Sequence, residues 1–119
     1  MRWESEATVQ VARHDRIFEI TVCGEIDYDE CDLLRAAWAE ADEAGLPTTL
    51  VDLSGVSFGD SQLLSALLDA RQRHEADGRG LVIAGPLQEN ITRLFTVSGT
   101  LAHFRVADSR DRVLRANGP

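Results

Sequence analysis

A carboxylate and a hydroxyl stand side by side near the middle of the chain, in the segment FGDSQLL at residues 58–64. The apolar run TTLVDLSGVSF leads into Asp60, and a leucine-rich run with helical spacing follows Ser61. We therefore expect Ser61 on a loop after a buried strand, at or just before the first turn of a helix. In sheets with helices on their faces, binding sites gather beyond the carboxyl ends of the strands.

Two interpretations of Ser61 follow from that position. Its hydroxyl can accept a hydrogen bond from a free backbone N–H at the helix start, and it is then only a cap. It can instead carry a phosphate, because the dipole and the unpaired N–H groups of a helix N-terminus stabilise anions. A phosphate would add about −1.5 to −2 charges at pH 7 and would repel an acidic or closely packed partner. The domain would then stay folded while its binding is switched off.

Catalysis by Ser61 is the less favoured interpretation. A serine nucleophile needs a histidine base and an oxyanion hole, and the chain contains no GxSxG motif. His74 follows Ser61 by 13 residues on the same expected helix, which puts it out of hydrogen-bond reach. His14 and His103 are scattered along the chain. We predict that the protein is not an enzyme and needs no cofactor.

The sequence does not favour a metal site either. Cys23 and Cys31 lack the paired spacing of zinc ligands, so we expect two buried or half-buried thiols. Acidic residues crowd the start of the first expected helix without the EF-hand pattern, and a helix N-terminus favours such charge by itself. These residues are Asp27, Asp29, Glu30 and Asp32.

Charge and composition narrow the function classes further. The net charge is −8, and all 12 basic residues are arginine. A P-loop and the pocket of a phospho-receiver domain both need a lysine, so both are excluded. The negative charge argues against nucleic acid and anionic membranes, and it suits a basic protein partner. No apolar run approaches the ~20 residues of a membrane helix and no secretion signal is present, so we expect a cytoplasmic protein.

Hydrophobic periodicity predicts alternating strands and helices. Two runs with period two, on either side of the polar segment 13–16, predict a β-hairpin whose second strand ends at Gly24. The later expected elements are a helix ending at Gly45, a short strand over 50–53, a leucine-striped helix running to about Glu75, a strand over 81–85, a helix ending at Gly99, a short strand within FRVAD and a final helix with Ser109 as N-cap.

The order β-β-α-β-α-β-α-β-α predicts an α/β fold. After the opening hairpin the strands alternate with helices, which favours parallel pairing. We expect one domain over residues 1–119, with its core at about 7–116. In this domain, helices pack on a mixed, mostly parallel sheet of about five strands.

Three segments resemble a known family. VDLSGVSFGDSQLLSALL, at residues 51–68, resembles the signature of STAS domains, in particular the bacterial anti-sigma-factor antagonists. That signature is an apolar strand ending in D-L-S, a short apolar turn, then D-S, a small residue, usually glycine, and leucine. GEID at 24–27 resembles the family's G-E-[IL]-D, and LVIAGPLQENITRLFTVSGT at 81–100 resembles its fourth strand and third helix. The similarity covers about residues 7–116 and implies a STAS-like domain.

The resemblance implies a phosphorylation switch in the cytoplasm. In that family the unmodified antagonist binds an anti-sigma factor, which is also a GHKL-type serine/threonine kinase, and thereby releases a sigma factor. The kinase phosphorylates the serine after the aspartate, the antagonist lets go, and a serine phosphatase resets it. Carried over to this chain, Ser61 is the phosphoacceptor. Asp60 shapes its loop, and Asp27 belongs to a neighbouring loop of the docking surface.

The chain departs from the family pattern around the acceptor. It has Gln62 and Leu63 where the family often has a small residue and glycine, and Gly59 where a larger apolar residue is usual. We therefore expect an altered docking surface that includes Gln62 and a partly exposed Leu63. One alternative is a non-switching scaffold or a subunit of a larger regulatory complex, in which Ser61 is only a cap. Nucleotide binding is a third hypothesis, after the switch and the scaffold, but the chain has no phosphate-binding loop to support it. The oligomeric state stays open, with a homodimer as one possibility.

Overall fold

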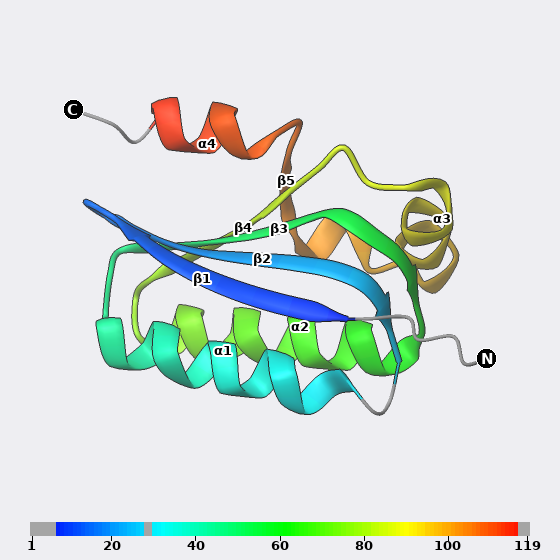
Figure 1. Cartoon of the computed structure of the whole chain (residues 1–119), viewed down its shortest axis with the longest axis horizontal. Coiled ribbons are helices and arrows are strands. Elements are labelled where there is room, and N and C mark those ends of the chain that lie inside the picture. Colours follow the sequence, from blue (N-terminus) through cyan, green and yellow to red (C-terminus); the bar gives the residue numbers. More distant parts are fainter. Residues whose placement is uncertain (1–6, 28–29, 117–119) are drawn as a thin grey trace.

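A five-stranded sheet in the order β1-β2-β3-β4-β5 forms the centre of the computed structural model, which describes residues 7–27 and 30–116 (Figure 1). Strands β1 (Thr8–His14) and β2 (Ile17–Ile26) pair antiparallel as a hairpin. Strands β3 (Thr48–Gly59), β4 (Gly80–Ala84) and β5 (Arg105–Ala107) follow in parallel pairs. The predicted mixed, mostly parallel sheet is confirmed.

The helices cover the sheet unequally. In Figure 1, α1 (Cys31–Ala44) and α2 (Ser61–Ala76) lie together below the sheet, while α4 (Arg110–Ala116) lies above it. Helix α3 (Glu89–Ser98) stands near the far end of β3, and an unpredicted 3₁₀ turn, Leu101–His103, follows it. Gly45 and Gly99 end α1 and α3 in the left-handed conformation, as predicted. None of the described helices is long and apolar enough to cross a membrane.

The main core lies between the sheet and the pair α1 and α2. Alternate residues of β2 and β3 face this layer, because successive side chains of a strand point to opposite faces. The largest fully buried side chains include Trp38, Phe95, Ile20, Ile26, Leu34, Leu53, Leu63, Leu67, Ile83 and Ile91. Most of the apolar residues at the helical and strand spacing in the sequence are buried in this core.

The other face of the sheet has a smaller core under α4. Val113 packs there, and Ser109 caps the helix by accepting a hydrogen bond from the Arg112 N–H at 3.2 Å, as predicted. Arg110 donates from Nε and Nη2 to the buried carboxylate of Glu19 in β2, and these hydrogen bonds hold the pKa of Glu19 below its ordinary value. This contact ties the last helix to the second strand.

Strands β2 and β3 are longer than the sequence predicted. Strand β2 continues past Gly24 to Ile26, and β3 continues to Gly59 instead of ending near residue 53. Gly24 has a φ of 97°, which a residue without a Cβ tolerates, and the register shifts there while pairing resumes at Glu25 and Ile26. A glycine that marks an irregularity inside a strand was thus mistaken for the end of the strand.

His74 is a buried polar residue inside this core. Its Nδ1 lies 2.7 Å from the Ala70 carbonyl oxygen, which can only accept, so Nδ1 carries the proton. Nε2 then accepts a hydrogen bond from the Thr49 hydroxyl, also at 2.7 Å. Both ring nitrogens of the neutral imidazole are satisfied, and burial lowers the pKa of His74 below its ordinary value.

We predict that His74 makes the protein less stable as the pH falls below about 6.5. The unfolded chain takes up a proton at His74 in this range, whereas the folded state does not. Urea unfolding between about pH 7.5 and 5.5 should therefore show a free energy that falls more steeply for wild type than for His74→Gln. His74→Gln should have a lower free energy of unfolding at every pH. It retains Glu19, so the change in stability on protonation of Glu19 is common to both proteins. Equal slopes would contradict a neutral, buried His74.

Candidate functional site

A single residue, Asp60, joins the end of β3 to the start of α2. It is extended, with φ −118° and ψ −167°, and its Oδ1 accepts a hydrogen bond from the Gln62 N–H at 2.9 Å. The Asp60 carbonyl accepts from the Leu63 N–H at 3.0 Å and so opens the helix. Asp60 is therefore the N-cap, and the alternative interpretation of the Ser61 hydroxyl as the helix cap is wrong. Strand β3 ends at Gly59 and α2 begins at Ser61, so Ser61 lies in the first helical turn, one of the two positions expected.

Ser61 is the first residue of α2, and its side chain is exposed. No hydrogen bond joins its hydroxyl to any residue that the structure describes. The cap function is supplied by Asp60, so the hydroxyl is free to react at the start of a helix of 16 residues. A phosphate there would sit where the helix dipole is favourable to anions.

Asp27 lies beside this junction. In the parallel pair of β2 and β3, Ile26 is opposite Gly59, so Asp27 follows β2 where Asp60 follows β3. The Asp27 N–H donates to Oε1 of Glu30 at 3.2 Å, and the Glu30 N–H donates back to the Asp27 carbonyl. These reciprocal bonds fix the turn from β2 into α1.

The acidic groups converge on Cys31 at the start of α1. Burial raises the pKa of the Cys31 thiol, and the charges of Asp60, Asp27 and Glu30 raise it further. The thiol is neutral at physiological pH, as expected for a buried cysteine. The site thus combines an exposed hydroxyl with at least two carboxylates at the carboxyl ends of neighbouring strands.

Leu63 is not part of the exposed site. It was expected to be partly exposed, but its side chain is fully buried in the main core. A Cβ added to Gly59 would lie 2.3 Å from Cδ2 of Leu63 and 3.4 Å from Cδ1 of Ile91. Leu63 therefore occupies the space that a larger residue at position 59 would need. The small residue at Gly59 and the large residue at Leu63, which both depart from the family pattern, therefore compensate each other in volume.

We predict that Gly59 and Leu63 are energetically coupled. Gly59→Ala alone should cost about 1–3 kcal/mol by overpacking, and Leu63→Ala alone about 2–5 kcal/mol by leaving a cavity. In the double variant the new methyl group enters that cavity, so the total cost should fall short of the sum by about 0.5–3 kcal/mol. Urea unfolding of the four proteins measures this difference.

The matched control pairs Gly59→Ala with Leu50→Ala. Leu50 is equally buried, but it belongs to the smaller core on the other face of the sheet, nine residues away along β3. These two changes should be additive within about 0.5 kcal/mol. Additivity of the Gly59 and Leu63 variants would contradict the compensation.

Helix α3 is held against the far half of β3. Strand β4 pairs with β3 only over Thr48–Asp52, so the next residues of β3 need other partners for their carbonyls. The amide of Gln88 donates to the Ser54 carbonyl at 3.0 Å, and the amide of Asn90 donates to the Ser57 carbonyl at 3.2 Å. These bonds position α3 next to the Asp60–Ser61 junction.

The sequence analysis missed an apolar hollow between β3 and α3. It has a volume of about 350 Å³ and lies directly before Asp60 in the chain. Phe58 is 45% exposed and Val97 is 80% exposed, which is unusual for large apolar side chains. The lining residues are Phe58, Gly59, Asn90, Arg93, Leu94 and Val97. The signal in the sequence is an aromatic residue just before the acceptor pair, on a strand that was predicted too short.

The structure brings together four of the five predicted site residues. Asp27, Asp60, Ser61 and Gln62 lie at one end of the sheet, and each is at least partly exposed. Leu63 lies beneath them in the core. Whether this cluster binds a partner remains a prediction.

No histidine stands near Ser61. His14 bonds Glu19 at 2.6 Å near the start of β2, and His74 bonds Thr49 near the start of β3. His103 precedes β5, so it also belongs to the amino ends of the parallel strands. Ser61 follows the carboxyl end of β3. This arrangement lacks the neighbouring base that a serine nucleophile requires.

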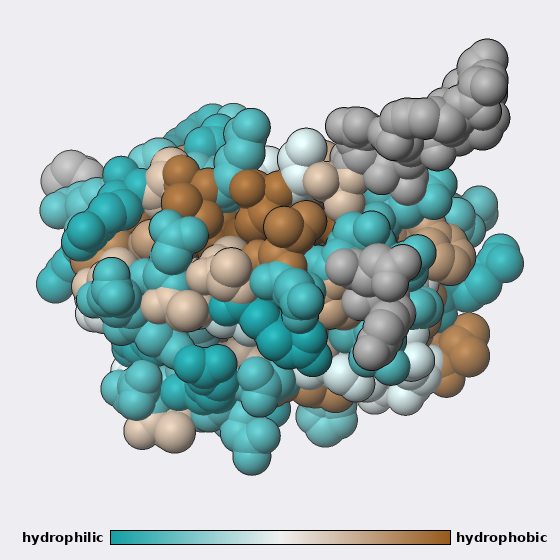
Figure 2. Space-filling view, turned by 60° about the horizontal axis from the view of Figure 1, so that its bottom comes forward, coloured by the Kyte–Doolittle hydropathy of each residue, from teal (hydrophilic) through white to brown (hydrophobic). Residues whose placement is uncertain are grey.

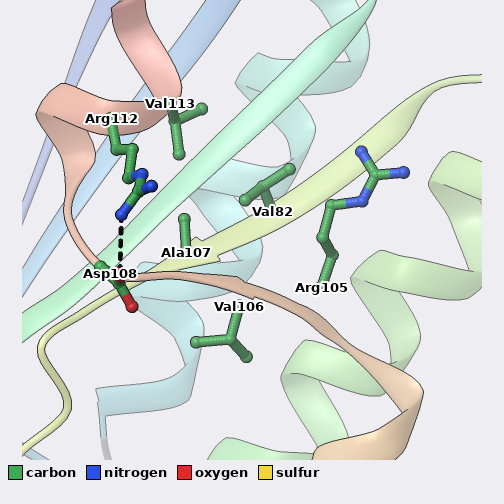
Figure 3. A pocket seen from close by; sticks show the side chains of 7 residues that line it. All are labelled: Val82, Arg105, Val106, Ala107, Asp108, Arg112 and Val113. Atoms are coloured by element: carbon green, nitrogen blue, oxygen red, sulfur yellow. Dashed lines mark hydrogen bonds and ion pairs between the residues drawn. The ribbon is translucent and has the colours of Figure 1, made fainter. Parts of the chain in front are cut away.

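A second hollow, of about 390 Å³, lies between β5 and α4. In Figure 3, Arg105 and Arg112 flank an apolar floor that includes Val82, and Arg112 pairs with Asp108 at 2.8 Å. It shares no residue with the Ser61 site. Among residues 7–27 and 30–116, no group of three His, Cys, Asp or Glu side chains could hold a metal ion, while Asp29 lies outside the described residues.

A family model described as "Mlab, STAS domain" matches residues 9–105 of the chain. This match contains the Asp60–Ser61 junction, the turn at Asp27 and the hollow beside α3. No curated protein sequence matches the chain.

Solved structures of anti-sigma-factor antagonists share the fold. An antagonist from Mycobacterium paratuberculosis superposes with a TM-score of 0.84 at 23% identity, over 98% of this chain and 97% of that one. The unphosphorylated form of SpoIIAA superposes with a TM-score of 0.77 at 20% identity, over 94% and 98% of the two chains. The phosphorylated form of SpoIIAA from Bacillus gives 0.72 at 19% identity, over 92% and 98%.

Proposed function

The chain belongs to the STAS-domain family, and on that premise we propose that it is an anti-sigma-factor antagonist switched off by phosphorylation of Ser61. Unmodified, it binds an anti-sigma factor in the cytoplasm and releases a sigma factor. The anti-sigma factor is also a GHKL-type serine kinase that phosphorylates Ser61, and a serine phosphatase removes the phosphate. The protein acts by binding and is not itself a catalyst.

The exposed hydroxyl of Ser61 is the observation that carries this proposal. It makes no hydrogen bond to a described residue, because Asp60 caps the helix in its place. A kinase can reach such a hydroxyl without unfolding the domain. The phosphate would add its charge at a helix N-terminus, so the fold tolerates it.

The same phosphate would change the surface that a partner meets. Asp27 and Asp60 already place two carboxylates at this end of the sheet, and the phosphate adds a doubly charged group beside them. A partner that docks closely must then displace water from the phosphate and the two carboxylates, and removing water from so many negative charges is costly. Binding is expected to fail for this reason rather than through a change in fold.

The apolar hollow beside α3 supplies the attractive part of the docking surface. Phe58 and Val97 expose large apolar area next to Ser61, and Arg93 lies at the same hollow without an ion pair to a described residue. A partner that fits inserts an apolar side chain between Phe58 and Val97 and places a carboxylate near Arg93. Buried apolar anchors of this kind carry most of the energy in protein interfaces.

Phosphate mapping tests the proposal. The purified chain is incubated with ATP and the kinase fraction of its host, and the modified peptide is identified by mass spectrometry. Wild type should gain one phosphate on Ser61, and Ser61→Ala should gain none. Ser65→Ala is the matched control, because Ser65 is exposed one turn later on the same helix. Phosphate on another residue, or none under conditions in which the kinase is active, would contradict the proposal.

A further inference from the structure

Strand β1 forms an open edge of the sheet. It pairs with β2 in an unbroken register, from Thr8 opposite Cys23 to His14 opposite Ile17, and no other described strand covers its outer side. Its sequence, TVQVARH, contains no proline, glycine or lysine, and it has no bulge. Natural edge strands are usually protected by such features, so this edge is open to pairing with another strand.

A hollow of about 320 Å³ lies beside this edge, between β1 and α1. Figure 2, in which α1 has been brought forward, shows hydrophobic side chains gathered above that helix, over β1. Val11 is 39% exposed there. The hollow is lined by Val11, Ala12, Phe18 and Ala44, together with the charged residues Arg13, Glu40 and Glu43.

Three charged residues line the hollow, and no ion pair within the described part of the chain neutralises them. Neither Arg13, Glu40 nor Glu43 makes an ion pair with a described residue, although other charges around the sheet are paired. Arg13 stands opposite Phe18, and Val11 stands opposite Ile20, so both point to the face that α1 covers. A cation arriving at Val11 on this face would meet the two free carboxylates of α1.

We propose that a second copy of this chain occupies the edge, with the two β1 strands antiparallel and Ala12 opposite Ala12 on the two-fold axis. In this register the second copy's Arg13 stands opposite Val11, beside Glu40 and Glu43. The arrangement repeats on the other side of the axis, because a two-fold interface uses the same patch twice. Two five-stranded sheets then join into one.

Charge complementarity selects a second copy over an unrelated strand. Any extended segment could form backbone hydrogen bonds with β1. To match the hollow as well, the partner strand must carry a basic residue and an apolar residue two positions apart, on the same face. Arg13 and Val11 supply that pair within β1 itself. No charge in this register stands directly opposite a like charge. The two Arg13 side chains are diagonal neighbours on one face, and Glu40 and Glu43 of the two α1 helices lie beside them to offset their charge.

The test is sedimentation equilibrium of the full chain over a concentration series that extends to its solubility limit. Wild type should approach twice the chain mass of 13.1 kDa. Arg13→Glu places carboxylates against Glu40 and Glu43, so its dimer dissociation constant should rise by at least about 30-fold. Arg16→Glu is the matched control, because Arg16 is exposed in the turn after β1 and should leave the dimer unchanged.

A charge exchange makes the test specific. Arg13→Glu combined with Glu40→Arg and Glu43→Arg restores opposite charges across the seam and should restore the dimer. All the altered side chains are exposed, and circular dichroism checks that each variant is folded. A wild type that stays at 13.1 kDa throughout would overturn the proposal. So would a dimer that responds equally to Arg13→Glu and Arg16→Glu, or one that the charge exchange does not restore.

Discussion

Replacing Ser61 with aspartate is expected to weaken binding to the proposed anti-sigma partner by at least about 30-fold, since an unpaired charge in a docked surface costs about 2–5 kcal/mol. The new carboxylate joins those of Asp60 and Asp27 at the end of the sheet. The melting temperature should change little, because the residue is exposed and stands at the N-terminus of α2. Calorimetric titration of the purified partner measures the affinity.

Two controls separate the charge at this position from a general effect of charge. Ser61→Ala removes the phosphoacceptor without adding charge, and it should bind within about threefold of wild type, since an exposed hydroxyl with no partner contributes little. Ser65→Asp adds the same charge one helical turn later, at another exposed serine. Equal losses in Ser61→Asp and Ser65→Asp would show that the position of the charge does not matter, which would contradict the switch.

Leu67→Ala is expected to lower the free energy of unfolding by about 2–5 kcal/mol, the range for a buried leucine that leaves a cavity. Leu67 lies in the middle of α2, is fully buried, and belongs to the core between the sheet and the two helices. Domains of this size are stable by only about 5–15 kcal/mol, so the loss is a large fraction of the total. Urea unfolding followed by circular dichroism measures it.

Leu33→Ala is the matched control for this prediction. Leu33 lies on α1, and its side chain is 43% exposed. Its replacement should change the stability by no more than about 0.5 kcal/mol, as for most surface positions. Equal effects at Leu33 and Leu67 would mean that the core is not where the structure places it.

The fold could be predicted from the sequence because its main signals are local. Alternation in β1 and β2 and the leucine stripe of α2 identify their elements without knowledge of distant contacts. Gly45 and Gly99 are recognisable helix ends, since their left-handed conformation suits glycine. The alternating order of strands and helices then limits the sheet to mostly parallel pairing.

The details of the site depended on contacts that are distant in sequence. Strand β3 runs to Gly59 because β2 pairs with it on one side and the amides of Gln88 and Asn90 bond it on the other. That length sets the helix start, and so makes Asp60 the cap and leaves Ser61 free. The local pattern offers both Asp60 and Ser61 as the cap, since aspartate and serine cap about equally well, and does not choose between them.

The burial of Leu63 agrees with its place in the leucine stripe of α2, which the expectation of partial exposure overlooked. Its position in the first turn of the helix suggested exposure, but Leu63 and Leu67 lie on the same buried side of α2. Its place in the core follows from the absence of a side chain at Gly59, which leaves the space that Leu63 fills. The same cause moves the apolar part of the proposed docking surface from Leu63 to Phe58 and Val97.

Capture of partners from a lysate of the native host tests the central claim most directly. The baits are wild type, Ser61→Ala and Ser61→Asp, and the captured proteins are identified by mass spectrometry. The phosphorylation switch predicts that wild type and Ser61→Ala retain a GHKL-type serine kinase and that Ser61→Asp does not. If all three baits retain the same proteins, Ser61 does not control binding, and the domain is a scaffold without this switch.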